Sequence, residues 1–253
     1  IQKLISNDSI LPKACDIAIG FLYQFDSINN WVLSPSRAGS AQIYNSFMKS
    51  GVNCLHLHND YNTKKYCPFA LPFTKNNIGI IDLLKYRASL NTNKLNIYFG
   101  VRDPISFAMS MQCCLFPYSS EEEIKNITYN INREEIRKHL PIETIKIIDE
   151  YLGHSMLLKP FDKINGFSII QYQNTNIYLY RLDSIDKIIN YLVQHQGLKV
   201  SIKKRKNTNF NYKNAIRNSK FDKDTINKLF SLPYVKDFFN DAQILEIKDK
   251  YLL

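Results

Sequence analysis

The chain has 253 residues, of which 45% are hydrophobic and 13% aromatic, so it can bury a sizeable core and is not a disordered chain. Its formal net charge of +10 indicates an anionic partner, but it does not distinguish nucleic acid, a nucleotide, an acidic glycan or a membrane surface. No apolar run is long enough to cross a bilayer, and the five cysteines lack metal-ligand spacing, which argues against a membrane-spanning protein and a cysteine metal site.

The sequence also gives expectations about cellular location and domain organisation. The five cysteines bear on location. Their odd number and irregular spacing are typical of free thiols in a reducing compartment, so we expect a cytoplasmic protein, with contact to the inner face of the membrane left open. The sequence begins at Ile1 and not at Met, so a preceding leader segment also stays open. We find no repeat and no linker, and therefore predict a single domain over residues 1–253.

A helix is expected over residues 12–25, and the first informative motif follows it. Trp31–Leu33 has the composition of a strand, residues 34–39 have that of a turn, and a helical pattern begins at Ser40, the expected N-cap. A strand that leads through a small-residue loop into a helix presents unpaired backbone N–H groups to one point, and Arg37 adds positive charge there. The motif predicts an anion site, although an ordinary turn between strand and helix would look similar.

The same motif argues against one class of enzyme. The phosphate loop of nucleotide kinases, Gly-x4-Gly-Lys-Ser/Thr, is absent, because a single glycine and no lysine follow the strand. Without the Lys-Ser/Thr pair, the motif lacks the residues that usually bind the magnesium ion and the phosphates of a nucleoside triphosphate. Hydrolysis of ATP or GTP is therefore disfavoured.

A second strand is predicted over residues 52–58 and carries two histidines. Alternation places Cys54, His56 and His58 on one face and the intervening leucines on the other. Histidines at the carboxyl end of such a strand lie where α/β folds bind ligands, and one of them could act as a general base. Two structural histidines, or a zinc site with Asp60 as the only nearby third ligand, are the alternatives.

A third strand is predicted over residues 94–101, and its nearly continuous apolar composition indicates burial on both faces. It leads directly into Arg102-Asp103-Pro104, where the proline is expected to open a helix. Arg102 and Ser110 could then face one anion at the carboxyl edge of the sheet, although a structural Arg102–Asp103 pair would also fit.

The remaining segments are predicted as follows: a helix start at Ser120, a helix over 143–151, a fourth strand over 177–183, a helix over 184–194, a basic run over 203–206, and two helices of the tail, 222–230 and 234–239, that pack on the sheet. The basic run alone would also fit a solvated surface or a nucleic-acid patch.

The two anion motifs, taken together, resemble those of sulfotransferases that use 3′-phosphoadenosine 5′-phosphosulfate (PAPS). In that family a strand, loop and helix near the N-terminus bind the 5′-phosphosulfate, and residues 36–42 match this place. A later strand ending in Arg-Asp/Asn-Pro, with a serine eight residues after the arginine, binds the 3′-phosphate, as Arg102 and Ser110 would here. Arg37 stands where the cytosolic enzymes usually have lysine.

A closer likeness is to bacterial sulfotransferase-like proteins assigned to capsular polysaccharide synthesis. They combine a Gly-Ser loop, a His-x-His strand, an Arg-Asp-Pro strand and a late strand ending in Arg-Leu-Asp/Glu, and the matching pieces run from about residue 31 to residue 239. The second histidine of the His-x-His strand is the base in some carbohydrate sulfotransferases. The resemblance therefore assigns catalysis to His58, with His56 beside it and Arg37 stabilising charge. It places Asp183 where a carboxylate is structural or near the acceptor.

The resemblance also implies the ligands. PAPS would be the donor, adenosine 3′,5′-bisphosphate the product, and a surface or capsular polysaccharide or its precursor the acceptor. No metal and no nucleic-acid partner are expected. The nucleotide would be bound by Arg37, Ala38, Gly39, Ser40, Ala41, Gln42, Arg102 and Ser110, and by Arg205 and Lys206 of the basic run.

The expected fold is therefore α/β, a P-loop-like three-layer sandwich with a central, mainly parallel sheet. Two other functions stay open. One is a P-loop nucleotide kinase or other phosphotransferase, and the other is a non-catalytic protein that binds an anionic glycan or nucleic acid.

Overall fold

The computed structural model describes residues 28–34, 38–57, 84–85, 87, 94–133, 136, 140–158, 160–198 and 210–253. Its elements, in chain order, are β1 (Asn30–Leu33), α2 (Ser40–Lys49), β2 (Cys54–Leu57), β3 (Leu95–Val101), α4 (Pro104–Leu115), α5 (Glu121–Lys125), α6 (Ile127–Asn132), α8 (Pro141–Leu152), the 3₁₀ turn η2 (Met156–Leu158), β4 (Phe167–Tyr172), β5 (Thr175–Arg181), the 3₁₀ turn η3 (Leu182–Ser184), α9 (Ile185–Gln196), α10 (Phe210–Asn218), α11 (Lys223–Phe230), α12 (Pro233–Phe238) and α13 (Asp241–Tyr251). The helix expected over residues 12–25 lies outside the described residues.

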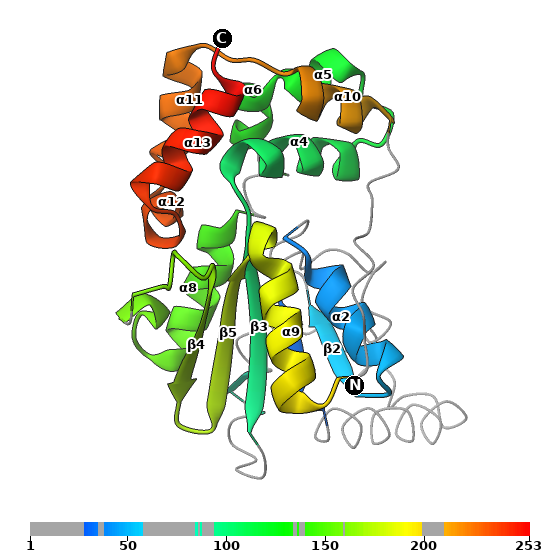
Figure 1. Ribbon diagram of the computed structural model, residues 1–253, viewed down its shortest axis with the longest axis vertical. Coiled ribbons are helices and arrows are strands. Elements are labelled where there is room, and N and C mark those ends of the chain that lie inside the picture. The colour runs from blue at the N-terminus through cyan, green and yellow to red at the C-terminus, as the bar shows by residue number, and fades with distance from the viewer. Residues whose placement is uncertain are drawn as a thin grey trace, which may run out of the picture.

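The strands form one sheet in the order β2-β1-β3-β5-β4 (Figure 1). The first four of these are parallel to one another, and β4 pairs antiparallel with β5. The prediction of an α/β protein with a mainly parallel sheet is therefore confirmed. The β4–β5 hairpin was not predicted, and its two-residue turn places Gln173 at a φ of 47°.

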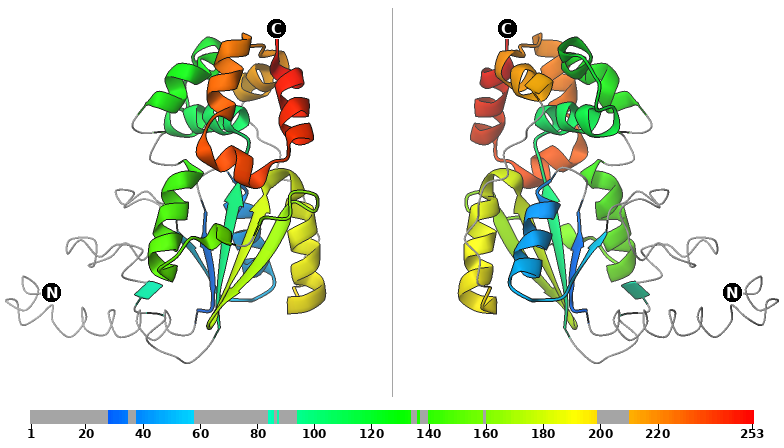
Figure 2. Two further views of the ribbon diagram at one scale, coloured as in Figure 1. Left: turned by 90° about the vertical axis from the view of Figure 1, so that its left-hand side faces the viewer. Right: turned by 90° about the vertical axis from the view of Figure 1, so that its right-hand side faces the viewer.

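Helices cover both faces of the sheet, an arrangement compatible with a three-layer sandwich (Figures 1 and 2). On one face, Val32 and Tyr98 pack with Ile43 of α2 and Ile188 of α9. The opposite face belongs to a second core, in which alternate residues of the same strands pack with Ile148 of α8 and with the helices beyond the sheet. β3 lies between the two cores and is buried on both faces, as its nearly continuous apolar composition predicted.

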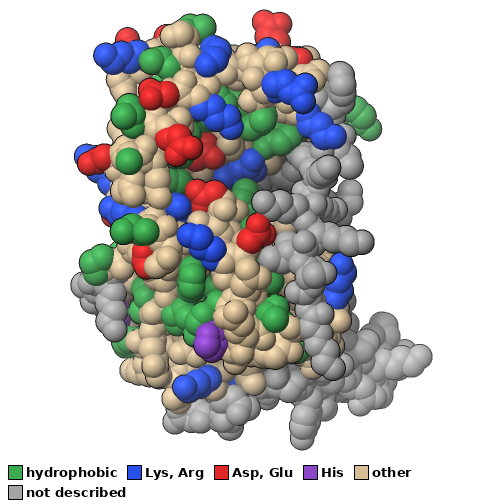
Figure 3. Space-filling model, viewed as in Figure 1, with side chains coloured by type: hydrophobic (Ala, Val, Ile, Leu, Met, Phe, Trp, Pro, Cys, Tyr) green, Lys and Arg blue, Asp and Glu red, His purple; other side chains and the backbone are tan. Residues whose placement is uncertain are grey.

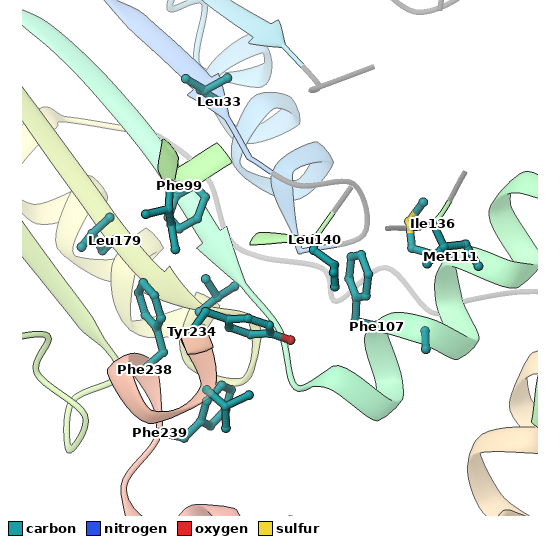
Figure 4. Close-up of a cluster of buried hydrophobic side chains, with 14 of the residues drawn as sticks. Leu33, Phe99, Phe107, Met111, Ile136, Leu140, Leu179, Tyr234, Phe238 and Phe239 are labelled. Atoms are coloured by element: carbon teal, nitrogen blue, oxygen red, sulfur yellow. The ribbon is translucent and has the colours of Figure 1, made fainter. Parts of the chain in front are cut away.

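The remaining helices, α4 to α6 and α10 to α13, gather beyond the carboxyl edge of the sheet (Figures 1 and 2). Side chains join this helical layer to the sheet: the ring centroid of Phe238 in α12 lies 6.2 Å from that of Phe99 in β3 (Figure 4). The same Phe238 ring lies 4.9 Å from the ring of Phe161. Of the two predicted helices of the tail, α12 thus packs on the sheet as expected. The other, α11, lies in the helical layer with α13, a helix that was not predicted.

A buried arginine also joins the sheet to this layer. Arg181, at the end of β5, donates from Nε to the carboxylate of Asp183 (3.0 Å). One of its terminal nitrogens donates to the carbonyl of Lys163 (3.0 Å) and to Oε1 of Gln243 in α13 (2.5 Å). The Asp183 side chain is 58% exposed, against 5% for Arg181, so Asp183 serves here as the outer partner of a structural pair.

An asparagine ladder links three strands near their amino ends. Asn96 donates from Nδ2 to Oδ1 of Asn30 (3.0 Å), and Asn176 donates in the same way to Asn96 (3.0 Å). The hydroxyl of Tyr98 also donates to Oδ1 of Asn30 (3.2 Å). These polar side chains lie in register on β1, β3 and β5, so they hold the three central strands together at the end opposite the carboxyl edge.

Candidate functional site

The ends of β1 and β3 lie side by side at the carboxyl edge of the sheet. β1 pairs with β2 on one side and with β3 on the other, with Val32 opposite Tyr98. The chain passes from β1 through α2 to β2, whereas β3 lies on the other side of β1, so the strand order reverses between β1 and β3. Parallel sheets bind ligands outside the carboxyl ends of the strands at such a reversal. Both anion motifs begin at this point.

The loop after β1 lies directly against β3. The Ser34 hydroxyl, which is fully buried, accepts a hydrogen bond from the backbone N–H of Gly100 (3.0 Å). A Cβ atom added to Gly100 would fall 2.4 Å from the carbonyl oxygen of Ala38 and 2.7 Å from the ring of Tyr180. Gly100 is therefore needed for the close approach of the loop backbone, and the loop contacts β3 only two residues before Arg102.

Gly39 fixes the start of α2. It is the N-cap of this helix with a φ of 85°, a left-handed conformation that favours glycine. An added Cβ would lie 2.6 Å from Cδ1 of Ile185 and 2.8 Å from Cδ1 of Leu182, so the loop is also packed against the turn between β5 and α9. Ser40 was expected to be the N-cap, and this was wrong: it is the first helical residue, because the left-handed turn is made by Gly39.

The first turn of α2 has the features of an anion site. The carbonyl of Gly39 already accepts from the N–H of Gln42 (2.9 Å), which closes the first helical turn. The N–H groups of Ser40 and Ala41 belong to the first helical positions, which have no intrahelical acceptor, and the helix dipole adds partial positive charge there. Ser40 is buried, whereas Ala41 and Gln42 are half-buried.

The second motif forms a tightly held turn at the end of β3. The Asp103 carboxylate is the N-cap of α4 and accepts from the N–H of Ser106 (2.8 Å), and Pro104 opens the helix as predicted. The carbonyl of Arg102 accepts from the hydroxyl of Tyr234 in α12 (3.2 Å), a ring that Figure 4 shows directed at this turn. Burial, reinforced by the charge of Asp103, raises the pKa of Tyr234 well above its usual value, so this tyrosine stays neutral.

The side chain of Arg102 is directed to the helical layer. Its guanidinium donates a short hydrogen bond to the hydroxyl of Tyr212 in α10. Ser110 lies two turns into α4, 1% exposed, one helical turn after Ser106. The hydroxyl of Ser106 in turn lies 3.4 Å from that of Tyr251 in α13.

On β2 the predicted alternation is confirmed for the described residues. Leu55 and Leu57 face the core that includes α8, while Cys54 belongs to the core beneath α2 and α9. His56 lies on the Cys54 side and stacks on the ring of Tyr44 in α2, with centroids 5.2 Å apart and 23° between the planes. His56 is thus placed beneath α2, one residue before the end of the strand.

Four of the expected site residues, Arg37, His58, Arg205 and Lys206, lie outside the described residues. Of the others, the structure gathers Ala38, Gly39 and Ser40 beside the end of β3, from which Arg102 follows. Three residues of the site were not predicted: Ser34, Gly100 and Tyr212. A glycine inside an apolar strand is a signal of close backbone approach, so Gly100 could have been found.

Searches of protein families, of curated proteins and of solved structures found no match to this chain. Within the described ranges, no group of three or more His, Cys, Asp or Glu side chains is arranged to hold a metal ion. None of the described helices is both long enough and apolar enough to cross a membrane.

Proposed function

We propose that this protein is a sulfotransferase with a P-loop-like, sulfotransferase-type fold, which moves a sulfuryl group from PAPS to a hydroxyl of a carbohydrate. The observation that carries the proposal is the contact of the first anion motif with β3, the strand from which the second anion motif follows. The carbonyl of Ala38 lies so close to Gly100 that a Cβ there would approach it to 2.4 Å, and Arg102 follows two residues later. By chain geometry the two motifs are on the order of 10 Å apart. One nucleotide with phosphates at both ends could therefore contact both.

In the proposed complex, the first turn of α2 and Arg37 bind the 5′-phosphosulfate, and Arg102 with Ser110 binds the 3′-phosphate, assisted by Arg205 and Lys206. His58 removes the proton of the acceptor hydroxyl, whose oxygen attacks sulfur while the bond from sulfur to the bridging phosphate oxygen breaks. Arg37, Ser40 and the loop amides stabilise the charge that develops on that oxygen. His56 would orient its neighbour. Adenosine 3′,5′-bisphosphate leaves as the product, and no step of this scheme uses a metal ion.

The proposed acceptor follows from the sequence resemblance, and the proposed location follows from the number and spacing of the cysteines. We propose a surface or capsular polysaccharide, or its precursor, as the acceptor, and a cytoplasmic enzyme that could work at the inner face of the membrane. On the face of the molecule in Figure 3, described basic and acidic side chains are intermingled over the helical layer. On this face the described side chains do not form the continuous basic stripe that is the usual sign of a nucleic-acid-binding surface.

A comparison of two nucleotides tests the proposal. Adenosine 3′,5′-bisphosphate should raise the melting temperature, whereas ATP with magnesium should not, because only a ligand that binds the folded state stabilises it. Stabilisation by magnesium ATP alone would identify a phosphotransferase. Binding that falls steeply with salt and shows no preference between the nucleotides would identify a non-catalytic anion-binding protein.

Two substitutions test the assigned residues. Arg102→Ala should weaken binding of adenosine 3′,5′-bisphosphate by about 1.5–3 kcal/mol, the range for a hydrogen bond to a charged group. His58→Ala should abolish sulfuryl transfer but leave nucleotide binding nearly intact. If both activity and binding are lost together in the histidine variant, His58 is a structural residue; if affinity is unchanged in the arginine variant, the 3′-phosphate assignment is wrong.

A further inference from the structure

Two side chains from separate helices hold Arg102, one at its backbone and one at its guanidinium. Tyr234 of α12 donates to the Arg102 carbonyl, and Tyr212 of α10 accepts from the guanidinium. The guanidinium carbon lies 6.0 Å from the centroid of the Tyr212 ring, at the limit of a cation–π contact, so the hydrogen bond to the hydroxyl is the main interaction between them.

The chemistry of this contact suits an arginine that must bind an anion. A hydroxyl oxygen accepts one of the five N–H groups of a guanidinium and fixes its plane, but unlike a carboxylate it brings no negative charge. The nearest carboxylate in the sequence, Asp103, is engaged as the N-cap of α4. Tyr212 thus orients Arg102 without competing, as an acidic residue would, with an incoming phosphate.

Tyr212 is itself held in place. Its side chain is 7% exposed, and the next turn of α10 places Ala215 in the same core at 0% exposure. The neighbouring Asn211 donates from Nδ2 to the carbonyl of Ser119 (3.0 Å), which joins α10 to the turn before α5. A packed helix with such an anchor is the kind of support that keeps a binding side chain in one orientation.

We propose that Tyr212 is a positioning residue, which orients the guanidinium of Arg102 toward the 3′-phosphate of the nucleotide. This inference depends on the proposed function. It assigns to α10, an element outside both anion motifs, a share in the recognition of the 3′-phosphate and hence in the discrimination between adenosine 3′,5′-bisphosphate and adenosine 5′-monophosphate.

The test compares the dissociation constants of these two nucleotides by isothermal titration calorimetry. Tyr212→Phe keeps the ring and removes only the hydroxyl. It should weaken binding of adenosine 3′,5′-bisphosphate by about 2- to 13-fold, the value of one hydrogen bond, and leave binding of adenosine 5′-monophosphate unchanged. Tyr151→Phe is the matched control, because it removes a tyrosine hydroxyl that bonds to Thr175 (2.9 Å) on β5, at the amino end of the sheet. This control should bind both nucleotides as the wild type does.

A double variant separates positioning from direct contact. In the Arg102→Ala background, Tyr212→Phe should have no further effect on either nucleotide, because the residue through which it acts is gone. A full additional loss would show that Tyr212 acts independently of Arg102 and would overturn the inference.

The remaining outcomes distinguish the inference from the proposed function. If the wild type does not prefer the nucleotide with the 3′-phosphate, the proposed function fails. If Arg102→Ala keeps that preference, the assignment of Arg102 to the 3′-phosphate is wrong and the positioning role of Tyr212 is refuted with it. If the wild type has the preference, Arg102→Ala removes it and Tyr212→Phe leaves it intact, the function stands and the positioning role of Tyr212 is refuted.

Discussion

Replacing Gly39 by alanine tests how much the packing of the loop after β1 contributes to the free energy of unfolding. The left-handed backbone of Gly39, with φ at 85°, costs an L-residue about 1–2 kcal/mol. The added Cβ would also lie 2.6 Å from Ile185 Cδ1 and 2.8 Å from Leu182 Cδ1. Both atoms are the ends of flexible side chains that can shift, at a cost of about 1–3 kcal/mol. We therefore expect Gly39→Ala to lower the free energy of unfolding by about 2–5 kcal/mol.

Gly51, at the other end of α2, provides the matched control. Its φ is 70°, and a Cβ added there would meet no heavy atom within 4 Å. Gly51→Ala should therefore carry the backbone cost alone, about 1–2 kcal/mol. Urea denaturation followed by circular dichroism measures both variants. Equal losses of stability would refute the packing of the loop against the turn between β5 and α9.

Four further substitutions test the surroundings of the site. Gly100→Ala would place a Cβ 2.4 Å from the backbone oxygen of Ala38, which cannot rotate away, so urea denaturation should show a loss of about 3 kcal/mol or more. Arg181→Ala removes the hydrogen bonds that this side chain donates to Asp183, Lys163, Phe238 and Gln243, and should lower the free energy of unfolding by about 3 kcal/mol or more, because buried acceptors lose their donor. Asp183→Ala should cost less, because its carboxylate is mostly exposed and Arg181 keeps its other three acceptors; similar losses would contradict this assignment. Burial raises the pKa of the Cys54 thiol from 9.0 to about 12, so the stability it contributes is complete below pH 9 and is lost as the pH rises toward 12. Cys54→Ala should therefore reduce the fall in urea midpoint between pH 9 and pH 10, and an unchanged fall would show that the thiol is not responsible.

The parts of the site that local patterns determine were predicted from the sequence. The apolar runs of β1 and β3 end in polar turns, and the rule that parallel strands present ligands at their carboxyl ends was enough to place both motifs at one edge. The helix starts at Pro104 and Ser120 were also predicted, and each is fixed by a side chain three or fewer residues away: Asp103 caps α4, and Glu123 completes the capping box of α5.

The parts that depend on distant residues were not predicted. Ser40 and Gly39 are both common N-cap residues, and the choice between them depends on packing against Leu182 and Ile185, more than 140 positions later. The contact of Arg102 with Tyr212 joins residues 110 positions apart and has no local signal. The β4–β5 hairpin was missed because its turn contains Gln173 in a left-handed conformation and lacks the Asn-Gly or Asp-Gly pair that usually marks such turns.

The asparagine ladder has a consequence for the order in which the sheet assembles. Asn30 and Asn96 are 66 positions apart, and Asn96 and Asn176 are 80 positions apart, so each rung closes a long stretch of chain. The β4–β5 hairpin, in contrast, closes through a two-residue turn and can form early. We therefore expect the asparagine hydrogen bonds to form after the transition state of folding, when the chain is already compact. Asn96→Ala should then accelerate unfolding more than it slows refolding, a difference visible in the two arms of a chevron plot.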